Sequence, residues 1–284
     1  MTSTTGIGLD RSAQGHFIRR MSQLPWWALL IALAGVVLFY SITTDELYSL
    51  IFRKLLQGIG TTLFVALVAY TGANLIGLFV GLGRVSKNPI VYNLATLYVQ
   101  IIRGVPILVQ IFYVAFVVTP AFFDFLNWLG GQLAGALGPD NFLMQATTQD
   151  VSLLARAVFA LTIAYGGFEA ETYRAGIESI GRGQMEAARS LGMSYGQAMR
   201  YVILPQAIRN VLPPLGNDFI SMLKDSSLVS VLGVRDITQE ARLYVSASFR
   251  YPETYNTLAF TYLSMTIVLS LGVKWLENRT QHGR

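Results

Sequence analysis

The chain has 284 residues, of which 53% are apolar and only 13% are charged. Because a soluble domain carries about a quarter charged residues, this composition indicates an integral membrane protein and argues against a soluble enzyme. Cysteine is absent and the two histidines lie in the polar tails, so disulfides and thiolate sites are excluded, and neither a buried histidine base nor a metal site is expected. The net charge of +5 fits the cytoplasmic face of a membrane, and no nucleic-acid partner is expected.

Six segments are long and apolar enough to cross a bilayer, which takes about 20 residues as a helix. The first, second and last contain no charged residue. The third contains Arg103 and a break at Gly104 and Pro106, the fourth contains Arg156, and the fifth holds three ionisable residues. The sequence therefore predicts an all-α polytopic membrane protein with about six transmembrane helices. The predicted spans are 21–44, 55–83, 90–119, 151–168, 208–234 and 254–273.

The first span is expected to be retained rather than cleaved as a signal peptide. Arg19 and Arg20 precede it, as in the positive region of a signal peptide. However, the apolar run is long, ends in Phe39 and Tyr40 and shows no small-residue cleavage site. It is therefore predicted to be an extra transmembrane helix ahead of the main domain.

The distribution of Lys and Arg predicts the orientation, because cytoplasmic loops are enriched in these residues. Both tails and the short loop 84–88 are basic, and the loop 174–209 holds five arginines and two glutamates. By contrast, 120–150 holds three aspartates and no Lys or Arg, and a short helix lying at the outer surface is expected there. Both termini and 174–209 are thus expected in the cytoplasm. The segment 235–256 fits less well, since it should be outside and yet carries three arginines.

Residues 183–205 in the long cytoplasmic loop are predicted to form two short helices joined by a hinge. A good helix-forming stretch ends at Gly192, which stands where a left-handed residue would close a helix. Ser194 and Gln197 form a capping-box pair that would start the second helix. Pro205 is expected to stop or kink that helix before the fifth span. This pattern by itself also fits a structured connection between two spans.

The spacing within this loop is more specific. This segment resembles the EAA loop of bacterial ABC importer permeases in the order and spacing of Glu186-Ala187-Ala188, Gly192, an aliphatic residue and Leu204-Pro205. The aliphatic residue is Val202, where that family has isoleucine. Five motifs in the right order look like the polar amino acid uptake branch, whose substrates are of the histidine, glutamine, arginine or glutamate type. They are Gln57–Leu63, Ile102–Gln110, Glu171–Ile177, Leu204–Ala207 and Leu223–Leu228. The predicted domains are an N-terminal cytoplasmic tail with the extra helix, a permease transmembrane domain and a C-terminal cytoplasmic tail, at 1–54, 55–277 and 278–284.

This resemblance implies an ABC importer type I permease fold in the lipid of the bacterial inner membrane. It implies that the chain pairs with a second permease subunit, identical or paralogous, above two ATP-binding subunits. It also implies that an amino acid arrives from a periplasmic or tethered substrate-binding protein. ATP and Mg would be bound by the partner subunits, and no cofactor is expected in this chain, which contains no GxxxxGK[ST] phosphate loop. The residues expected to dock on the ATPase are Glu186, Ala187, Ala188, Gly192, Leu204 and Pro205.

Ionisable residues within spans need a partner or a polar cavity, so they are candidates for the substrate route. Arg103 stands beside Pro106, which is expected at the first position of a new half-helix, and would hold the α-carboxylate of an amino acid. The alternative for Arg103 is a structural kink with the side chain reaching lipid headgroups. Glu169 has no obvious local partner and is a second candidate, whereas Glu171 and its neighbouring arginine form a structural pair. Arg156 is expected either to meet headgroups or to favour anionic side chains.

Asp218, Ser221 and Asp225 recur on one face of the fifth span by their helical spacing and would line the same route. Alternatively, Lys224 pairs with an acid and locks two subunits together. The expected substrate-path residues are thus Arg103, Glu169, Asp218, Ser221 and Asp225.

An ion-coupled secondary carrier that works without an ATPase is the alternative within transport. An intramembrane enzyme is disfavoured, because no nucleophile–base pair or metal cluster appears in the sequence. A membrane scaffold would not explain the charges within the spans.

Overall fold

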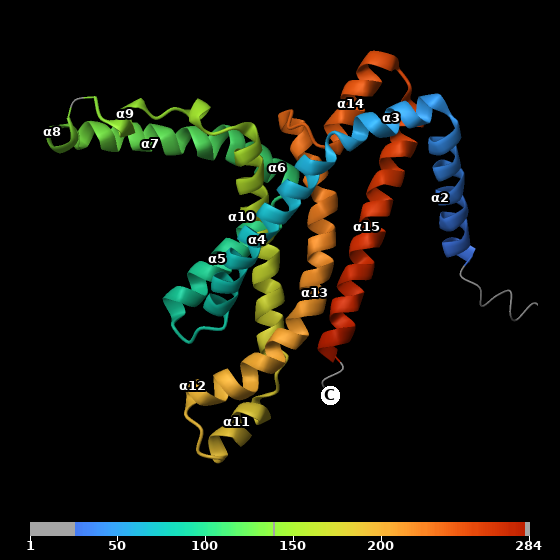
Figure 1. The fold of residues 1–284 in the computed structure, drawn as a ribbon. Coiled ribbons are helices and arrows are strands. Elements are labelled where there is room, and N and C mark those ends of the chain that lie inside the picture. The colour runs from blue at the N-terminus through green and yellow to red at the C-terminus, as the bar shows by residue number, and fades with distance from the viewer. Residues whose placement is uncertain (1–25, 139, 282–284) are drawn as a thin grey trace, which may run out of the picture. The chain divides into compact units, whose positions relative to one another are not determined.

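The computed structural model describes residues 26–138 and 140–281, and these residues form helices joined by short turns without any strand (Figure 1). The all-α prediction is thereby confirmed for them. The N-terminal tail at 1–25 and the last residues, 282–284, lie outside the described residues, and the predictions made for them stay predictions. The chain divides into two compact units, Met1–Leu50 and Ile51–Arg284.

The smaller unit contains the first span. Helix α2 (Trp26–Thr44) is apolar on every side and is long enough to cross a membrane, which confirms the described part of the predicted span 21–44. Asp45 ends the span and starts α3 (Glu46–Leu56), because its carboxylate accepts a hydrogen bond of 2.7 Å from the backbone N–H of Leu47.

The core of the larger unit is built on α4 (Ile59–Arg84) and α10 (Leu153–Glu178), which pack along one another (Figure 1). Both helices carry Gly and Ala where they meet, so their backbones approach closely, as is common between membrane helices. At Gly77 an added Cβ would collide with the Cβ of Glu169. The larger apolar side chains Val65 and Leu161 fill the rest of this interface.

The predicted third span, 90–119, is two helices in the structure, α5 (Pro89–Gly104) and α6 (Ile107–Tyr113). The predicted break is therefore confirmed, and its cause is Pro106, which lacks an N–H and forces Val105 into an extended conformation. Pro106 occupies the N-cap rather than the first helical position, which corrects that prediction by one residue. The side-chain amide of Gln110 donates to the carbonyls of Ile102 and Val105, both at 2.7 Å, and so pairs groups that the break leaves free.

The chain after Pro106 is continuously helical through α6, the π-helix η1 (Val114–Val118) and α7 (Thr119–Gln132). Helices α8 (Ala134–Leu137) and α9 (Phe142–Gln145) and the 3₁₀ turn η2 (Thr148–Asp150) lead back to α10. Residues 120–150 are thus helical in part, but α7 is the end of a continuous helical stretch, Ile107–Gln132, that is long and apolar enough to cross a membrane, so the short helix expected at the outer surface stays a prediction.

Arg156 has a structural role that neither sequence interpretation foresaw. Its guanidinium donates to the carbonyls of Val151 at 3.0 Å and Ala115 at 3.2 Å, and also to that of Thr148. The side chain thus ties η1 and the incoming loop to the first turn of α10. The expectations of headgroup contact and of a preference for anionic side chains stay predictions, since Arg156 is only half-buried.

The fifth predicted span, 208–234, differs most from expectation. The structure has α13 (Leu204–Asp225), followed by the 3₁₀ helix η4 (Ser226–Leu232). Among the described residues five helical segments, and not six, are long and apolar enough to span a membrane, and α13 is not one of them, because it carries polar and charged residues along its length. It packs against both α10 and α15 (Tyr251–Gln281), and Asp218 and Asp225 face α10, whereas Arg209, Asn217 and Lys224 are exposed.

The last predicted span, 254–273, lies within α15, which is helical through Gln281 and so includes much of the predicted C-terminal tail. Before it, α14 (Ile237–Ser248) is fixed to α4 by a bond of 3.2 Å from the N–H of Ile237 to the hydroxyl of Thr62. Asp236 caps α14, accepting from the N–H of Gln239 at 2.8 Å, and burial raises the pKa of this carboxyl above its usual range.

Candidate functional site

The predicted hinge between two short helices is present. Helix α11 (Arg182–Ser190) ends at Leu191, and Gly192 follows with a φ of +82°, in the left-handed region that the sequence predicts for it. The N–H of Met193 bonds to the carbonyl of Ala188 at 3.2 Å, as expected where a left-handed residue closes a helix. This fixes the direction in which the chain leaves α11.

The second helix begins as its capping box predicts. The N–H of Gln197 donates to the hydroxyl of Ser194 at 3.3 Å, and the N–H of Ser194 donates to the side chain of Gln197 at 2.8 Å. Helix α12 (Tyr195–Ala198) then passes through a π-helix, η3 (Met199–Ile203), directly into α13. Pro205 therefore does not stop the helix, because it lies in the first turn of α13, after a π-helical turn that alters the hydrogen-bond register.

The residues expected to dock on an ATPase do not all face outward. Glu186, Ala187 and Gly192 are exposed, as are Leu204 and Pro205. Ala188 is buried, and α11 packs against η3, so Ala188 holds α11 to its own chain. The sequence interpretation missed two apolar side chains on the exposed side of this segment, which are Leu191, 81% exposed, and Tyr195, 55% exposed.

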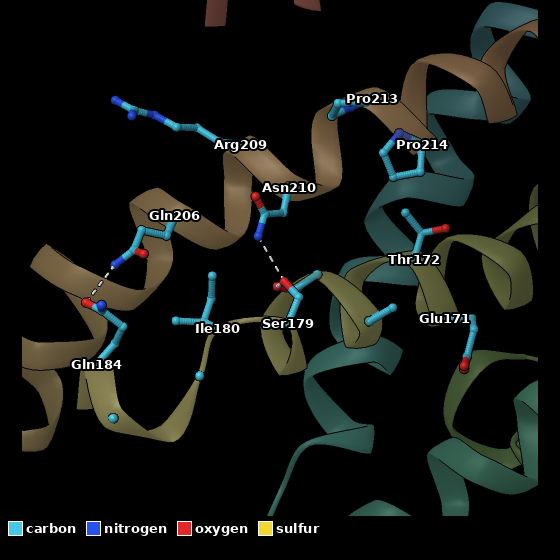
Figure 2. Close-up of a pocket in the computed structure, with 14 residues that line it drawn as sticks. Glu171, Thr172, Ser179, Ile180, Gln184, Gln206, Arg209, Asn210, Pro213 and Pro214 are labelled. Carbon is cyan, nitrogen blue, oxygen red and sulfur yellow. Dashed lines mark hydrogen bonds between the residues drawn. The ribbon is translucent and has the colours of Figure 1, made fainter. Parts of the chain in front are cut away.

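A cleft of about 1270 Å³ separates α13 from the end of α10 and from α11 (Figure 2). Its walls meet at two polar contacts. The amide of Asn210 donates to the hydroxyl of Ser179 at 2.9 Å, and that of Gln206 lies 3.5 Å from the side-chain oxygen of Gln184. In Figure 2 these four side chains point toward one another across the cleft, whereas Arg209 points away. Across the cleft, α11 thus meets α13 through the long Gln184–Gln206 contact, whereas Asn210 bonds to Ser179 just after α10.

At the far end of the cleft α13 contains Pro213 and Pro214 in succession. A proline has no N–H, so the carbonyls of Arg209 and Asn210 lack their usual helical donors. The helix therefore has two carbonyls without helical donors between residues 183–205 and the segment that carries Asp218.

The interface between α10 and α13 brings together the predicted acids of the substrate route. Glu169 is fully buried, and neither carboxylate oxygen has a hydrogen-bond partner among the residues that the structure describes. Asp218 accepts from the hydroxyl of Thr172 at 3.2 Å, and Asp225 accepts from the phenol of Tyr165 at 2.7 Å. Ser221 is half-buried, one turn from Asp218 and Asp225.

Arg103 lies apart from these acids, on α5. Its side chain is exposed, and its Cζ atom is 5.8 Å from the centre of the Phe168 ring on α10. Lys224 is exposed, and within the described chain no ion pair joins it to Asp225, whose partner is Tyr165. The structure therefore gathers Glu169, Asp218 and Asp225 but does not place Arg103 with them.

Several partners of these residues were missed by the sequence interpretation. The predicted pair of Glu171 with Arg174 is present, and Arg84 from α4 joins it as a third charged member. Tyr165 and Thr172 could have been found, because with Glu169 they form a stripe of polar side chains at helical spacing along an otherwise apolar α10.

Comparison with known proteins identifies similar sequences along most of the chain. The family described as the inner membrane component of binding-protein-dependent transport systems matches residues 73–282. The probable amino-acid permease protein YxeN of Bacillus subtilis is 36% identical over 78% of this chain and 88% of its own length. The glutamine transport system permease protein GlnP of Escherichia coli K12 is 34% identical over 79% of this chain and 92% of its own.

Two solved structures have a similar fold. A chain from an amino acid ABC transporter crystallised with histidines is 37% identical, covers 80% of this chain and 94% of its own length, and superposes with a TM-score of 0.65. A chain of the inward-facing MetNI methionine ABC transporter matches 81% of this chain and 97% of its own length, with a TM-score of 0.61. At 19% identity, the second likeness supports the fold alone.

Proposed function

Because the chain belongs to the inner membrane components of binding-protein-dependent transport systems, we propose that it is the transmembrane permease subunit of an ATP-driven amino acid importer. The observation that carries this function is the likeness to the amino acid ABC transporter chain, at 37% identity over 80% of the sequence with the same fold. ATP hydrolysis belongs to a separate subunit, in keeping with the lack of a phosphate loop in this sequence.

A permease of this kind works with an ATPase and a substrate-binding protein. In our proposal the complex contains two permease subunits, identical or paralogous, and two ATP-binding subunits. Both termini and the coupling segment, 183–205, face the cytoplasm, and 120–150 faces outward. The uneven distribution of Lys and Arg supports this orientation.

The coupling segment is the part of this chain that would receive work from the ATPase. The exposed face of α11 carries Glu186 and Ala187, and Leu191 extends it at the helix end. Ala188 on the opposite face anchors α11 to η3, so a push on α11 reaches α13 through continuous helix. Leu204 and Pro205 lie at the start of that helix and so transmit the movement.

The substrate route in our proposal follows the interface of α10 and α13. Glu169 is positioned to accept the ammonium group of an amino acid, since its oxygens have no partner within the described chain. Asp218, Ser221 and Asp225 continue the polar face of α13 along the same interface. Arg103, at the broken helix and on another side of α10, would meet the substrate carboxylate at a separate point of the route.

Reconstitution tests this function. The chain is purified with its ATPase and binding protein, placed in vesicles, and supplied with labelled amino acids and ATP. Uptake is expected only when all components and hydrolysable ATP are present. Uptake by the permease alone, driven by an ion gradient, would instead establish the secondary carrier.

A further inference from the structure

Helix α7 begins at the level where α10 begins. The guanidinium of Arg156, in the first turn of α10, donates to the carbonyl of Ala115 in η1, one turn before α7 starts. Thr119 and the residues after it therefore lie at or beyond the Leu153 end of α10. Figure 1 shows α7 running sideways from that end rather than along α10. By length and composition the continuous helix Ile107–Gln132 could cross a membrane, but its sideways course from this end of α10 favours a position of α7 along the membrane edge.

One face of α7 is covered by its own hairpin. Gly130 lies against Asn141 and Met144, and the amide of Asn141 donates to the carbonyl of Gly130 at 2.9 Å. The amide of Asn127 reaches the carbonyls of Leu143 and Ala146 when it is oriented to satisfy both. These polar contacts hold α9 on one side of α7.

The opposite face of α7 is aromatic and has no cover in the described chain. Phe122, Phe125 and Trp128 recur at steps of three residues and are 54%, 53% and 59% exposed. The rings of Phe125 and Trp128 stack with centres 5.9 Å apart. Asp124 stands at the edge of this stripe. A soluble surface would not leave three large aromatic side chains in a row in water.

We propose that this aromatic stripe of Phe122, Phe125 and Trp128 lies in the interfacial layer of the bilayer, so that the α7–α9 hairpin is a lateral lipid anchor of the subunit. The continuous helix supports lipid as the partner of the aromatic stripe, because α7 extends without interruption from a segment that packs within the membrane domain. Composition supports it as well, since aromatic side chains, Trp above all, favour the headgroup level. The lack of any Lys or Arg in 120–150 means that the anchor takes neutral lipid by apolar contact rather than anionic lipid by charge.

Tryptophan fluorescence tests this anchor in the full chain. Replacing Trp26, Trp27 and Trp275 by Phe leaves Trp128 as the single tryptophan. The protein is reconstituted in phosphatidylcholine vesicles that carry bromine either near the headgroup or at the middle of the acyl chain. Trp128 is expected to lose most of its emission to the shallow bromines, less to the deep ones, and little to aqueous iodide.

Each other outcome overturns the proposal. Strong quenching by iodide means that the stripe faces water. Strongest quenching by the deep bromines means that α7 crosses the bilayer. Protection from all quenchers means that protein, such as a second copy, covers the stripe. A matched control moves the tryptophan to exposed Gln149 in a Trp128→Phe background, where iodide is expected to quench most.

Spin labels provide a second readout that does not depend on tryptophan. Because the chain has no cysteine, single cysteines at Ala121, beside the stripe, and at Asp124, at its edge, can be labelled separately. The label at 121 is expected to be more accessible to oxygen, and the label at 124 to a water-soluble nickel chelate. Equal accessibility of both positions to the nickel chelate contradicts the anchor. Neither measurement depends on transport, so failure of the anchor and failure of the proposed function are distinguishable.

Discussion

The phenol of Tyr165 on α10 donates a hydrogen bond of 2.7 Å to the carboxylate of Asp225 on the last turn of α13. Sixty residues separate the two side chains in sequence. The bond crosses the interface that also holds Glu169 and Asp218, and it lies at the end of α13 remote from the coupling segment. It therefore fixes one end of α13, while the paired prolines Pro213 and Pro214 leave the other end freer to bend.

Removing the donor of this bond is expected to destabilise the subunit. In Tyr165→Phe the half-buried carboxylate of Asp225 loses its partner, and a hydrogen bond to a charged group contributes about 1.5–3 kcal/mol. The thermal unfolding midpoint of the detergent-purified complex should therefore fall. Asp225→Asn is the matched control, because an amide oxygen still accepts from the phenol, and its midpoint should fall less. Equal midpoints for wild type and Tyr165→Phe would contradict this role.

Gly192 is expected to be essential for coupling rather than for folding of the spans. Its φ of +82° costs a side chain about 1 kcal/mol or more, most for a β-branched one, so Gly192→Val should redirect the chain that leaves α11. Substrate-stimulated ATP hydrolysis in the reconstituted complex should fall, or the ATPase should dissociate. Gly183→Ala is the control, since Gly183 has open space around it and lacks a positive φ.

Reversing the charge of Glu186 tests the same segment in a second way. Glu186→Lys reverses an exposed charge on α11 and should lower stimulated hydrolysis and uptake without changing capture of substrate by the binding protein, which acts across the membrane. ATPase co-purification distinguishes loss of docking from loss of coupling. If Gly192→Val and Glu186→Lys both retain normal stimulation and uptake, the segment is only a connector.

Local sequence signals predicted the features that depend on a few neighbouring residues. The break before α6 follows from Pro106, and the turn after α11 follows from Gly192 and the capping residues behind it. Both are determined by backbone chemistry that single residues impose, so no knowledge of the tertiary fold was needed.

Features that depend on distant partners could not be predicted in this way. Arg156 finds the carbonyl of Ala115, and Ala188 turns inward, only because separate helices meet there. Two acids of α13, Asp218 and Asp225, find hydroxyl partners on α10, which hydropathy along one segment cannot show. Pro205 continues a helix because a π-turn precedes it, and that turn has no clear sequence signature.

Arg103→Ala is expected to impair transport without preventing assembly. If Arg103 holds the substrate carboxylate, the lost bond of about 1.5–3 kcal/mol lowers uptake at limiting substrate on the order of tenfold or more. The side chain is exposed beside the ring of Phe168, so its removal leaves no buried cavity. Arg103→Lys keeps the charge and should retain part of the activity. Unchanged kinetics in an assembled Arg103→Ala complex would leave the kink or headgroup interpretation.

Labelling from one side of the membrane tests the orientation. A single cysteine at Ser194 should react with an impermeant reagent only after the cells are opened, and one at Gln149 should react in intact cells. Both positions are exposed in the structure, so access to the reagent is decided by the side of the membrane. Labelling of Ser194→Cys in intact cells would show that the chain has the opposite orientation in the membrane.

Replacing Glu169 tests whether its carboxylate acts in transport or only supports the structure. It is fully buried without a hydrogen-bond partner in the described chain, and an unpaired charge is costly within a membrane domain. Glu169→Gln keeps the shape of the side chain and removes the charge, so the unfolding midpoint should stay the same or rise. Uptake should nevertheless fall sharply if the carboxylate receives the substrate ammonium group. Glu171→Gln is the contrasting variant, because it breaks the ion pairs with Arg84 and Arg174 and should lower the midpoint. Normal uptake by Glu169→Gln, together with an unchanged midpoint, would remove Glu169 from the substrate route.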